Sequence, residues 1–330
     1  MPRIFILPVI TWILALVGIF IWGGVHAFML AAVLTVLEIT LSFDNAVVNA
    51  KVLTKMSPAW QSRFLTWGIL FAVVFTRFVL PILIVAAAVM RSPAAIAEIA
   101  FSDPGAYAAL LEHAKPLIAS FGGAFLMMVS LRYFIDEDKD VHWLAALERG
   151  LSKIGRIEAF EIAFTLALVA LMAAFLPNPA GVLFAGVIGV ILFIVMEGIT
   201  SAFTLGSSAA AGGLALFLYL NVLDAAFSLD GVVGAFAITG LIPVIVVGLG
   251  VGAYFVRSIT LYLVREKTLD SLAYLEHGAH YAILGLALAM FASLFFEVPE
   301  VATGGLGLLI VAAAIWSSLR ERKKDKHLAV

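Results

Sequence analysis

The chain has 330 residues, of which 63% are hydrophobic and 13% are charged, and its formal net charge at pH 7 is −2. A soluble domain is usually about 45–50% apolar and about 25% charged, so this composition excludes a soluble globular protein and indicates a polytopic membrane protein. The near-neutral charge gives no sign of a nucleic-acid partner. Because the chain has no cysteine, disulfides and thiolate metal sites are excluded.

Apolar runs of about 20 residues can cross a bilayer as helices, and we expect ten of them. With the N-terminus inside, ten alternating spans leave sixteen of the twenty Lys and Arg residues on the cytoplasmic side, so both termini are expected there. The first run resembles a signal peptide but lacks a small-x-small cleavage site, so we expect it to be retained as a span. The expected spans are 5–22, 26–50, 63–90, 116–135, 159–176, 181–203, 212–238, 241–264, 274–296 and 302–319.

Two segments outside the spans are rich in charge. Residues 136–158, "DEDKDVHWLAALERGLSKIGRIE", have a helical pattern and are expected to form an amphipathic cytoplasmic linker, with a regulatory role as the open alternative. The basic tail, residues 320–330, is expected to lie at the inner membrane surface.

An internal repeat relates the two halves of the chain. "EITLSFDNAVV" from Glu38 aligns with "DAAFSLDGVVG" from Asp224, and further along "GILFAVVFTR" aligns with "GLGVGAYFVR". Because the repeated unit has five spans, an odd number, the two copies are expected in opposite orientations, as in many secondary transporters. The fold class expected is therefore an all-α polytopic membrane protein of about ten transmembrane helices in two inverted five-helix repeats. The first repeat comprises 1–135 with spans one to four and 159–176 with span five, and the second comprises 181–319.

Four acids in two matched places require partners, because a charge at the centre of a lipid-facing helix costs at least about 2.5–3.5 kcal/mol. On a helix, Asp44 and Asp230 each lie six residues beyond their partner acids and about 120° around the axis from them. They could join one site if the helix unwinds locally, which Gly231 would ease, or if the facing half approaches from that side. The side chains that share a helix face with the first acid of each pair are Ser42, Asn45 and Asn49 for Glu38, and Asn221 and Ser228 for Asp224.

Carboxylate, amide and hydroxyl oxygens are hard ligands that suit Mg²⁺, Ca²⁺ or Mn²⁺. Four ionised acids together with Arg77 and Arg257 carry a formal charge of −2, which one divalent cation would neutralise. The two arginines are expected to be structural counter-ions; the alternative is a charge that expels the cation in one conformation.

Three further side chains are candidates for the transport path. Glu197, in "IVMEGITS", is expected either to be buried and paired or to line the path. In "LEHGAH", Glu276 and His280 could share a helix face as a ligand pair or proton relay; an interfacial role for His277 and His280 is the alternative.

The pairing of "ExxLSFDN" with "DxxFSLDG" resembles the TerC family of integral membrane proteins, within the LysE-like exporter superfamily. The resemblance is clearest over 30–90 and 215–295. It implies inverted repeats and export of divalent metal, chiefly Mn²⁺, with the metal at Glu38, Asp44, Asn45, Asp224 and Asp230. The chain departs from the family in having about ten expected spans where seven are usual, and in having Gly231 where the first motif has Asn45.

The leading hypothesis is a secondary exporter of divalent cations, with Mn²⁺ favoured over Ca²⁺ or Mg²⁺ and with a proton or Na⁺ as the candidate counter-ion. No P-loop motif is present, which favours coupling to an ion gradient. We expect no resident cofactor and no enzymatic activity, and a bacterial-type inner membrane as the location. A TerC-type factor for membrane-protein assembly is one alternative. An intramembrane aspartyl protease is another, but "FSLDG" does not supply the "GxGD" motif that such proteases share.

Overall fold

A computed structural model describes residues 3–136, 141–154, 157, 159–206 and 209–328. Regular structure within these residues is entirely helical, as the composition predicted. Seven helices are long and apolar enough to cross a membrane, which confirms the membrane-helix character of the chain. They are Ile6–Leu41, Pro58–Ala88, Pro104–Ile135, Pro179–Ala202, Gly212–Ile238, Ile242–Arg265 and Ala302–Arg322.

The ten expected spans fall largely on helical backbone, but four of them are not separate long helices. The first two belong to one element, α1 (Ile6–Leu41). The fifth is the 14-residue α8 (Phe160–Ala173), and the ninth is the 18-residue α13 (Leu275–Ala292). The count of ten spans and the inverted-repeat topology therefore stay predictions.

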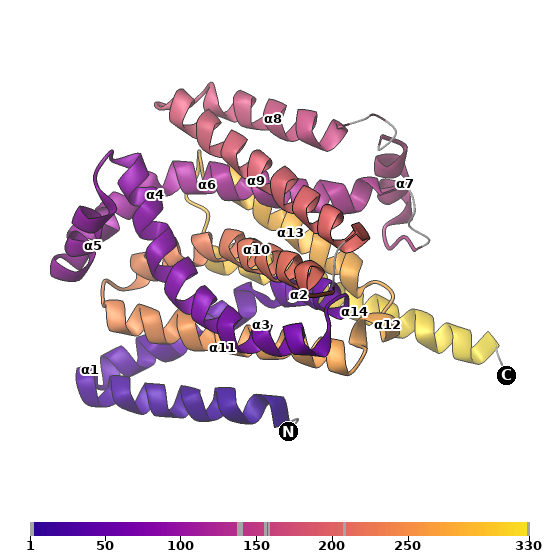
Figure 1. Cartoon of the computed structure of the whole chain (residues 1–330), viewed down its shortest axis with the longest axis horizontal. Coiled ribbons are helices and arrows are strands. Elements are labelled where there is room, and N and C mark those ends of the chain that lie inside the picture. The colour runs from indigo at the N-terminus through magenta and orange to yellow at the C-terminus, as the bar shows by residue number, and fades with distance from the viewer. Residues whose placement is uncertain (1–2, 137–140, 155–156, 158, 207–208, 329–330) are drawn as a thin grey trace.

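Within α1 the chain turns back on itself at Gly24, where φ is 70° and ψ is −165°. This conformation is open to glycine because it has no Cβ. The turn separates two arms of α1 (Figure 1), at the boundary expected between 5–22 and 26–50.

A second break lies between the first two acids of the expected site. α1 ends at Leu41, Ser42 leaves the helical conformation with φ −102° and ψ 16°, and α2 (Phe43–Thr54) follows. Glu38 is thus on one helix and Asp44 on the next, as in the local unwinding that was one of the two ways expected for both acids to join one site.

The next span changes its helical geometry in the middle. It begins as α3 (Pro58–Leu70), continues as the π-helical segment η2 (Phe71–Val79), and ends as α4 (Leu80–Ala88). π-Helical turns inside α-helices often occur at functional sites, and this one carries Arg77.

α6 (Pro104–Ile135) is the most deeply buried of the seven spans. α6 contacts α8, α9, α10 and α13. The helices not yet given bounds are α5 (Pro93–Ser102), α7 (Ala145–Ile154), α9 (Pro179–Gly206), α10 (Ala209–Ile238), α11 (Ile242–Arg265), α12 (Thr268–Ser271) and α14 (Glu300–Leu328). α14 runs through the tail expected at 320–330, so most of that tail extends the last helix.

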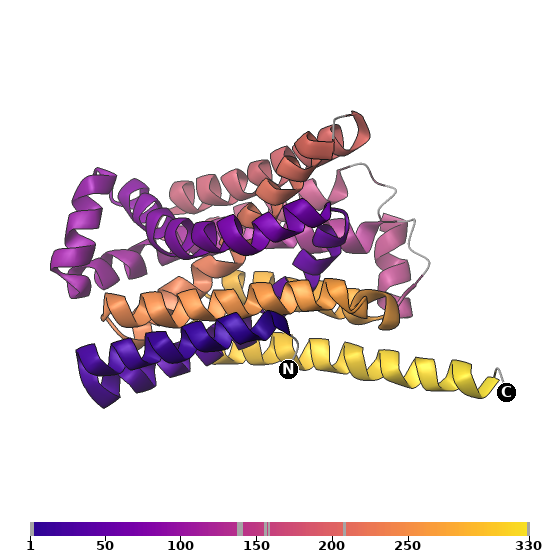
Figure 2. The same ribbon diagram turned by 60° about the horizontal axis from the view of Figure 1, so that its bottom comes forward.

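α1, α11 and α14 lie together along one side of the molecule (Figure 2). Gly248 and Gly252 of α11 face Leu34 and Glu38 of α1, and a Cβ on either glycine would collide with these side chains. Small residues four apart let two membrane helices approach closely, which brings Glu38 against α11.

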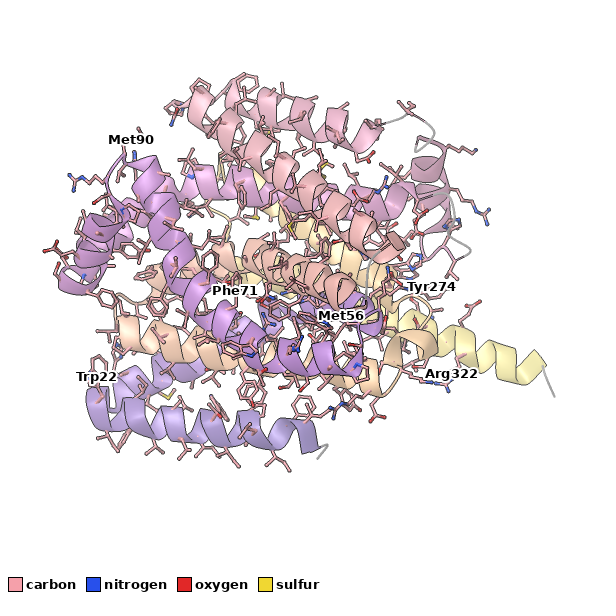
Figure 3. All side chains as sticks on the ribbon, viewed as in Figure 1. Trp22, Met56, Phe71, Met90, Tyr274 and Arg322 are labelled. Carbon is pink, nitrogen blue, oxygen red and sulfur yellow. The ribbon has the colours of Figure 1, made fainter. Side chains whose placement is uncertain are left out.

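Expected outer turns and expected cytoplasmic segments lie at opposite ends of the molecule, while the end that faces the cytoplasm stays a prediction. Trp22 and Met90, from expected outer turns, lie at one end in Figure 3, and Tyr274 and Arg322, from expected cytoplasmic segments, lie toward the other. The spans therefore connect these two ends.

Candidate cation site and inner cavity

The two acidic stretches of the sequence meet inside the helix bundle. Asn45 Nδ2, on α2, donates a hydrogen bond to Asp224 Oδ1, on α10, at 2.9 Å. A Cβ on Gly231 of α10 would lie 3.5 Å from Glu38 Oε2. The stretches beginning at Glu38 and Asp224 thus face each other, as the repeat predicted.

Each arginine pairs with the acid of its own half. Arg77 Nη2 forms an ion pair with Glu38 Oε1, and Arg257 Nη2 lies 3.0 Å from Asp224 Oδ2. All four side chains are buried. The matched positions in the sequence are therefore matched in their contacts, and the role of the two arginines as counter-ions stays a prediction.

Further contacts hold the two arginines in place. Arg257 donates to Asn221 Oδ1 at 3.4 Å and to the Phe64 carbonyl at 3.3 Å, and its guanidinium lies 4.2 Å from the centre of the Phe64 ring. Arg77 donates to the Ala72 carbonyl within the π-helical segment at 2.8 Å. These contacts fix the positive charges beside Glu38 and Asp224.

Asp44 differs from these two acids because no ion pair to it exists among the described residues. Its side chain is buried, and Oδ1 accepts a hydrogen bond from the backbone nitrogen of Asn45 at 2.8 Å. A buried carboxylate without a basic partner favours binding of a cation.

Three more buried oxygens of the two acidic stretches have no hydrogen-bond partner in the described part of the chain. They are Asn45 Oδ1, Asn49 Oδ1 and Ser228 Oγ. An unsatisfied buried polar atom costs about 1–3 kcal/mol, so such oxygens usually have a role that requires them. Neutral oxygen donors of this kind fit a hard cation.

A small cavity connects the first acidic stretch with α10, α13 and α14. Glu38, Ser42, Asp44 and Gly231 line it, together with residues that include Gly307. Its volume is about 30 Å³, which is room for one water molecule or a bare cation. Ser42 Oγ also donates to Glu38 Oε1 at 3.3 Å, so the side chain at the helix break is tied to the first acid.

The full set of four acids is not assembled within the described residues. No group of three or more His, Asp or Glu side chains there is placed to hold one metal ion. Asp230 lies on α10 directly before Gly231, but its side chain is outside the described residues. A cage formed by Glu38, Asp44, Asp224 and Asp230 therefore stays a prediction.

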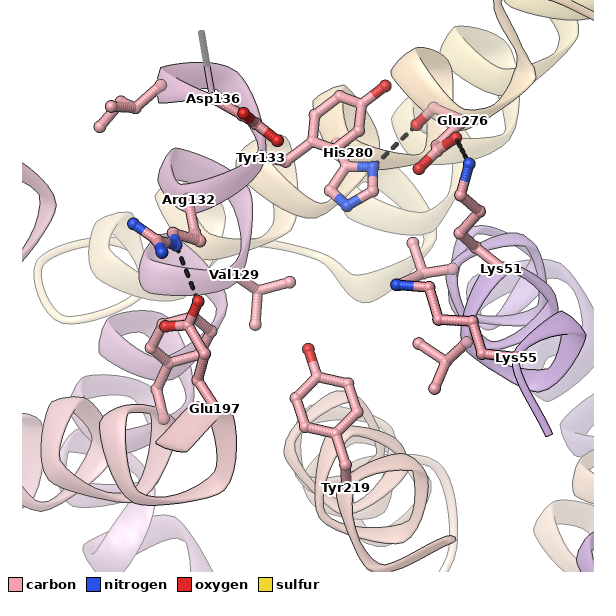
Figure 4. A pocket seen from close by; sticks show the side chains of 14 residues that line it. Lys51, Lys55, Val129, Arg132, Tyr133, Asp136, Glu197, Tyr219, Glu276 and His280 are labelled. Carbon is pink, nitrogen blue, oxygen red and sulfur yellow. Dashed lines mark hydrogen bonds and ion pairs between the residues drawn. The ribbon is translucent and has the colours of Figure 1, made fainter. Parts of the chain in front are cut away.

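A larger cavity of about 550 Å³ opens near the C-terminal end of α2 (Figure 4). Glu197, Glu276 and His280 all line it. Glu197 accepts from Arg132 Nε at 2.7 Å, and Glu276 pairs with Lys51 Nζ at 2.8 Å. Glu197 is thus both paired and exposed to the cavity.

Glu276 and His280 share the cavity, and His280 contacts the backbone of Glu276. His280 Nδ1 lies 2.8 Å from the backbone carbonyl of Glu276, and its ring stacks on Tyr133 with centroids 3.6 Å apart. A role for this pair as ligands or as a proton relay stays a prediction.

Several residues of the larger cavity were not expected as part of a site. Lys51, Lys55 and Arg132 counted only as cytoplasmic charges in the sequence, yet they line the cavity together with Asp136 and Tyr219. A helical repeat could have revealed part of this arrangement: Asp44, Val48, Lys51 and Lys55, at steps of four, three and four, lie on one face of α2.

The linker is anchored by a glutamate that its sequence did not single out. Glu148 of α7 is buried, and its carboxylate lies 3.3 Å from His142 Nδ1 and 3.4 Å from His277 Nε2. It also accepts hydrogen bonds from Tyr281 Oη and the Leu144 backbone nitrogen, both at 3.1 Å. The amphipathic helix expected within 136–158 is present as α7, and Glu148 docks it on α13.

A family model described as "Protein of unknown function (DUF475)" matches residues 43–325. No curated protein and no solved structure matches the chain.

Proposed function

The chain belongs to the DUF475 family, and for this member of it we propose secondary transport that exports divalent metal cations, with Mn²⁺ the favoured substrate. One observation carries the proposal. Asp44 is a buried carboxylate without an ion pair among the described residues, at the contact between two acid-bearing stretches that also supply unpartnered oxygens.

Charge supports a divalent substrate. The pairs Glu38–Arg77 and Asp224–Arg257 are each formally neutral. Asp44 has no ion pair among the described residues, and together with Asp230 of the second stretch it carries a formal charge of −2. A divalent cation that binds between the stretches would neutralise them, and a proton or Na⁺ could replace it during the return step.

The kind of ligand limits which metals fit. Carboxylate, amide and hydroxyl oxygens favour Mn²⁺, Mg²⁺ and Ca²⁺, and the donors around Asp44 include no nitrogen or sulfur ligand within the described residues. These donors suit all three metals, and the resemblance of both motifs to the TerC family is what favours Mn²⁺ among them.

Alternating access is the proposed mechanism. Ten spans in two inverted five-helix repeats would bring Asp44 and Asp230 to a site between the halves, and rocking of one half against the other would expose it to each side. The break at Ser42 and the π-helical segment around Arg77 are the irregular parts of the helices at the site. Both interruptions can absorb changes in backbone angle while the packed helices move as rigid bodies.

Under this proposal Arg77 and Arg257 hold Glu38 and Asp224 as ionised carboxylates. Asp44 and Asp230 bind the cation, and Asn45 both supplies an oxygen and ties the halves together through Asp224. The membrane would be a bacterial-type inner membrane.

The test is Mn²⁺ transport by the purified full-length protein in proteoliposomes. Asp44→Asn and Asp230→Asn keep the size of each side chain but remove its charge, so each variant should lose at least about 90% of the transport rate, the loss expected when more than 1.4 kcal/mol of cation binding is removed. Glu112→Gln is the matched control, because Glu112 is an exposed acid that pairs only with Lys115 among the described residues.

Transport by both aspartate variants at the wild-type rate would overturn the proposal. Competition by Mg²⁺, Ca²⁺ and Zn²⁺ in the same vesicles would rank the metals, and an imposed proton or Na⁺ gradient would identify the counter-ion.

A further inference from the structure

The larger cavity lies at the end of the molecule that carries the expected cytoplasmic segments. Its polar residues come from five helices: Lys51 of α2, Arg132 of α6, Glu197 of α9, Tyr219 of α10 and Glu276 of α13. In Figure 4 the lysines of α2 extend into the cavity from one wall, while Arg132 and Glu197 face them from another. We call this cavity, lined by these residues, the inner vestibule.

One face of α2 connects the inner vestibule with the candidate cation site. Asp44 lines the small cavity, Val48 lines the vestibule one turn later, and Lys51 follows. With a rise of 1.5 Å per residue, Asp44 and Lys51 are about 10 Å apart along the helix axis. A cation that enters the vestibule is therefore about two helical turns from the buried carboxylate.

Glu276, an acid that lines the vestibule, is already paired with a positively charged side chain of the protein, that of Lys51 on α2. Lys51 Nζ lies 2.8 Å from the Glu276 carboxylate, and the two side chains are 47% and 25% exposed. The pairs at the cation site, by contrast, are almost completely buried. Exposed pairs are weak and exchange readily, and lysine is a compact charge on a flexible stem.

We infer that Glu276 is a loading site for cytoplasmic divalent cations and that Lys51 is a tethered counter-ion that an arriving cation displaces. The displaced lysine then repels the cation from the vestibule wall toward Asp44. Without a cation, Lys51 keeps Glu276 neutralised and ties α2 to α13. The role of this subsite in export depends on the proposed function, but cation binding in the vestibule can be measured without transport.

The absence of native cysteine makes a direct binding test possible. Val52→Cys places a single thiol in the lining of the vestibule, and Met90→Cys places one at the opposite end of the molecule, where the side chain is exposed. The rate of modification by a membrane-impermeant thiol reagent is measured on the full-length protein with increasing MnCl₂. Mn²⁺ should slow modification of Val52→Cys and leave Met90→Cys unchanged.

Two charge substitutions then test whether Glu276 binds the cation and whether Lys51 competes with it. In the Val52→Cys background, Lys51→Gln removes the competing cation and should lower the Mn²⁺ concentration for half-protection, by up to about fivefold. Glu276→Gln removes the ligand and should abolish protection. Lys115→Gln and Glu112→Gln, which change an exposed pair outside the vestibule, are the matched controls and should leave protection unchanged.

The Asp44→Asn background separates this inference from the proposed function. If Mn²⁺ still protects Val52→Cys in the Asp44→Asn background while export is lost, the result supports both the loading site at Glu276 and the proposed transport site at Asp44. Export that survives Asp44→Asn refutes the proposed site, while the protection data still decide the vestibule. Protection that is absent, or equally strong in Lys51→Gln, Glu276→Gln and the controls, overturns the inference.

Discussion

Arg257 provides the sharpest test of whether the intramembrane arginines are counter-ions. Its side chain is 2% exposed and that of Asp224 is 9% exposed, so the pair is shielded from water on all sides. Arg257→Gln leaves the Asp224 carboxylate buried beside an uncharged amide. Removing one partner of a buried pair typically costs about 3–5 kcal/mol of folding stability, because the remaining charge is uncompensated.

The double variant Arg257→Gln with Asp224→Asn removes both charges together. Because neutral groups replace a buried pair whose desolvation cost offsets most of its attraction, the double variant should recover most of the loss. Asn221 and Asn45, which contact Arg257 and Asp224, can still bond to the new amides. The coupling free energy in this double-mutant cycle should therefore be about 2 kcal/mol or more.

The assay is thermal unfolding of the purified proteins in the same detergent. The readout is the fraction of protein that remains monodisperse at each temperature. Arg257→Gln should lower Tm by roughly 5–10 °C, and the double variant should return most of that difference. Lys115→Gln, with or without Glu112→Gln, is the control for an exposed pair and should change Tm by little. Additive losses in the double variant would refute the counter-ion role, because then neither charge depends on the other.

Two further predictions concern packing around the site. Gly252→Leu should destabilise the protein and impair export, because even a Cβ at this position of α11 would collide with the Glu38 side chain; thermal unfolding and Mn²⁺ transport measure both effects. Glu148→Gln should loosen α7 from α13, since Glu148 joins His277 and Tyr281, and hydrogen exchange of the α7 amides should rise severalfold relative to those of α6. Unchanged exchange in α7 would show that apolar contacts alone hold the linker.

Much of the helical architecture could be predicted from hydropathy, because a bilayer requires long apolar helices. The boundaries were less predictable. α6 begins twelve residues before the span expected at 116–135 and continues through Pro116, which shows that tertiary packing overrides a local helix breaker. Hydropathy also cannot separate a short helix such as α8 from a full span.

For the candidate site, the repeat predicted that the two acidic stretches meet, but it did not predict which acids form ion pairs. Glu38 and Asp224 occupy matched positions, as do Arg77 and Arg257, and each acid pairs with the arginine of its own half, whereas the contact between Asn45 and Asp224 joins positions that the repeat does not match. The lack of an ion pair to Asp44 among the described residues could not be predicted, because it depends on which side chains of distant helices pack around it. The inner vestibule was also missed, since Lys51 and Glu276 are 225 residues apart and resemble ordinary interfacial charges.

Gly231 gives the most direct test of whether the small cavity is on the cation path. In the second stretch it stands where Asn45 stands in the first, and its missing side chain leaves room for the Glu38 carboxylate. Gly231→Ala would place a methyl group 3.5 Å from Glu38 Oε2, an ordinary contact, so this variant should fold and export Mn²⁺. Gly231→Leu adds three more carbons to a cavity of about 30 Å³ and should fill it.

We therefore expect Gly231→Leu to lose export while it remains monodisperse in detergent, because leucine favours helix more than glycine by roughly 0.5–1 kcal/mol and part of the packing strain is offset. Gly305→Leu on α14 is the matched control: a Cβ at Gly305 meets no atom within 4 Å, so the same substitution there should leave export intact. Loss of export in Gly231→Leu alone would locate the cation beside Glu38 and Asp44. Export by Gly231→Leu at the wild-type rate would mean that the cation passes elsewhere, and the carboxylate of Asp44 would then need another explanation.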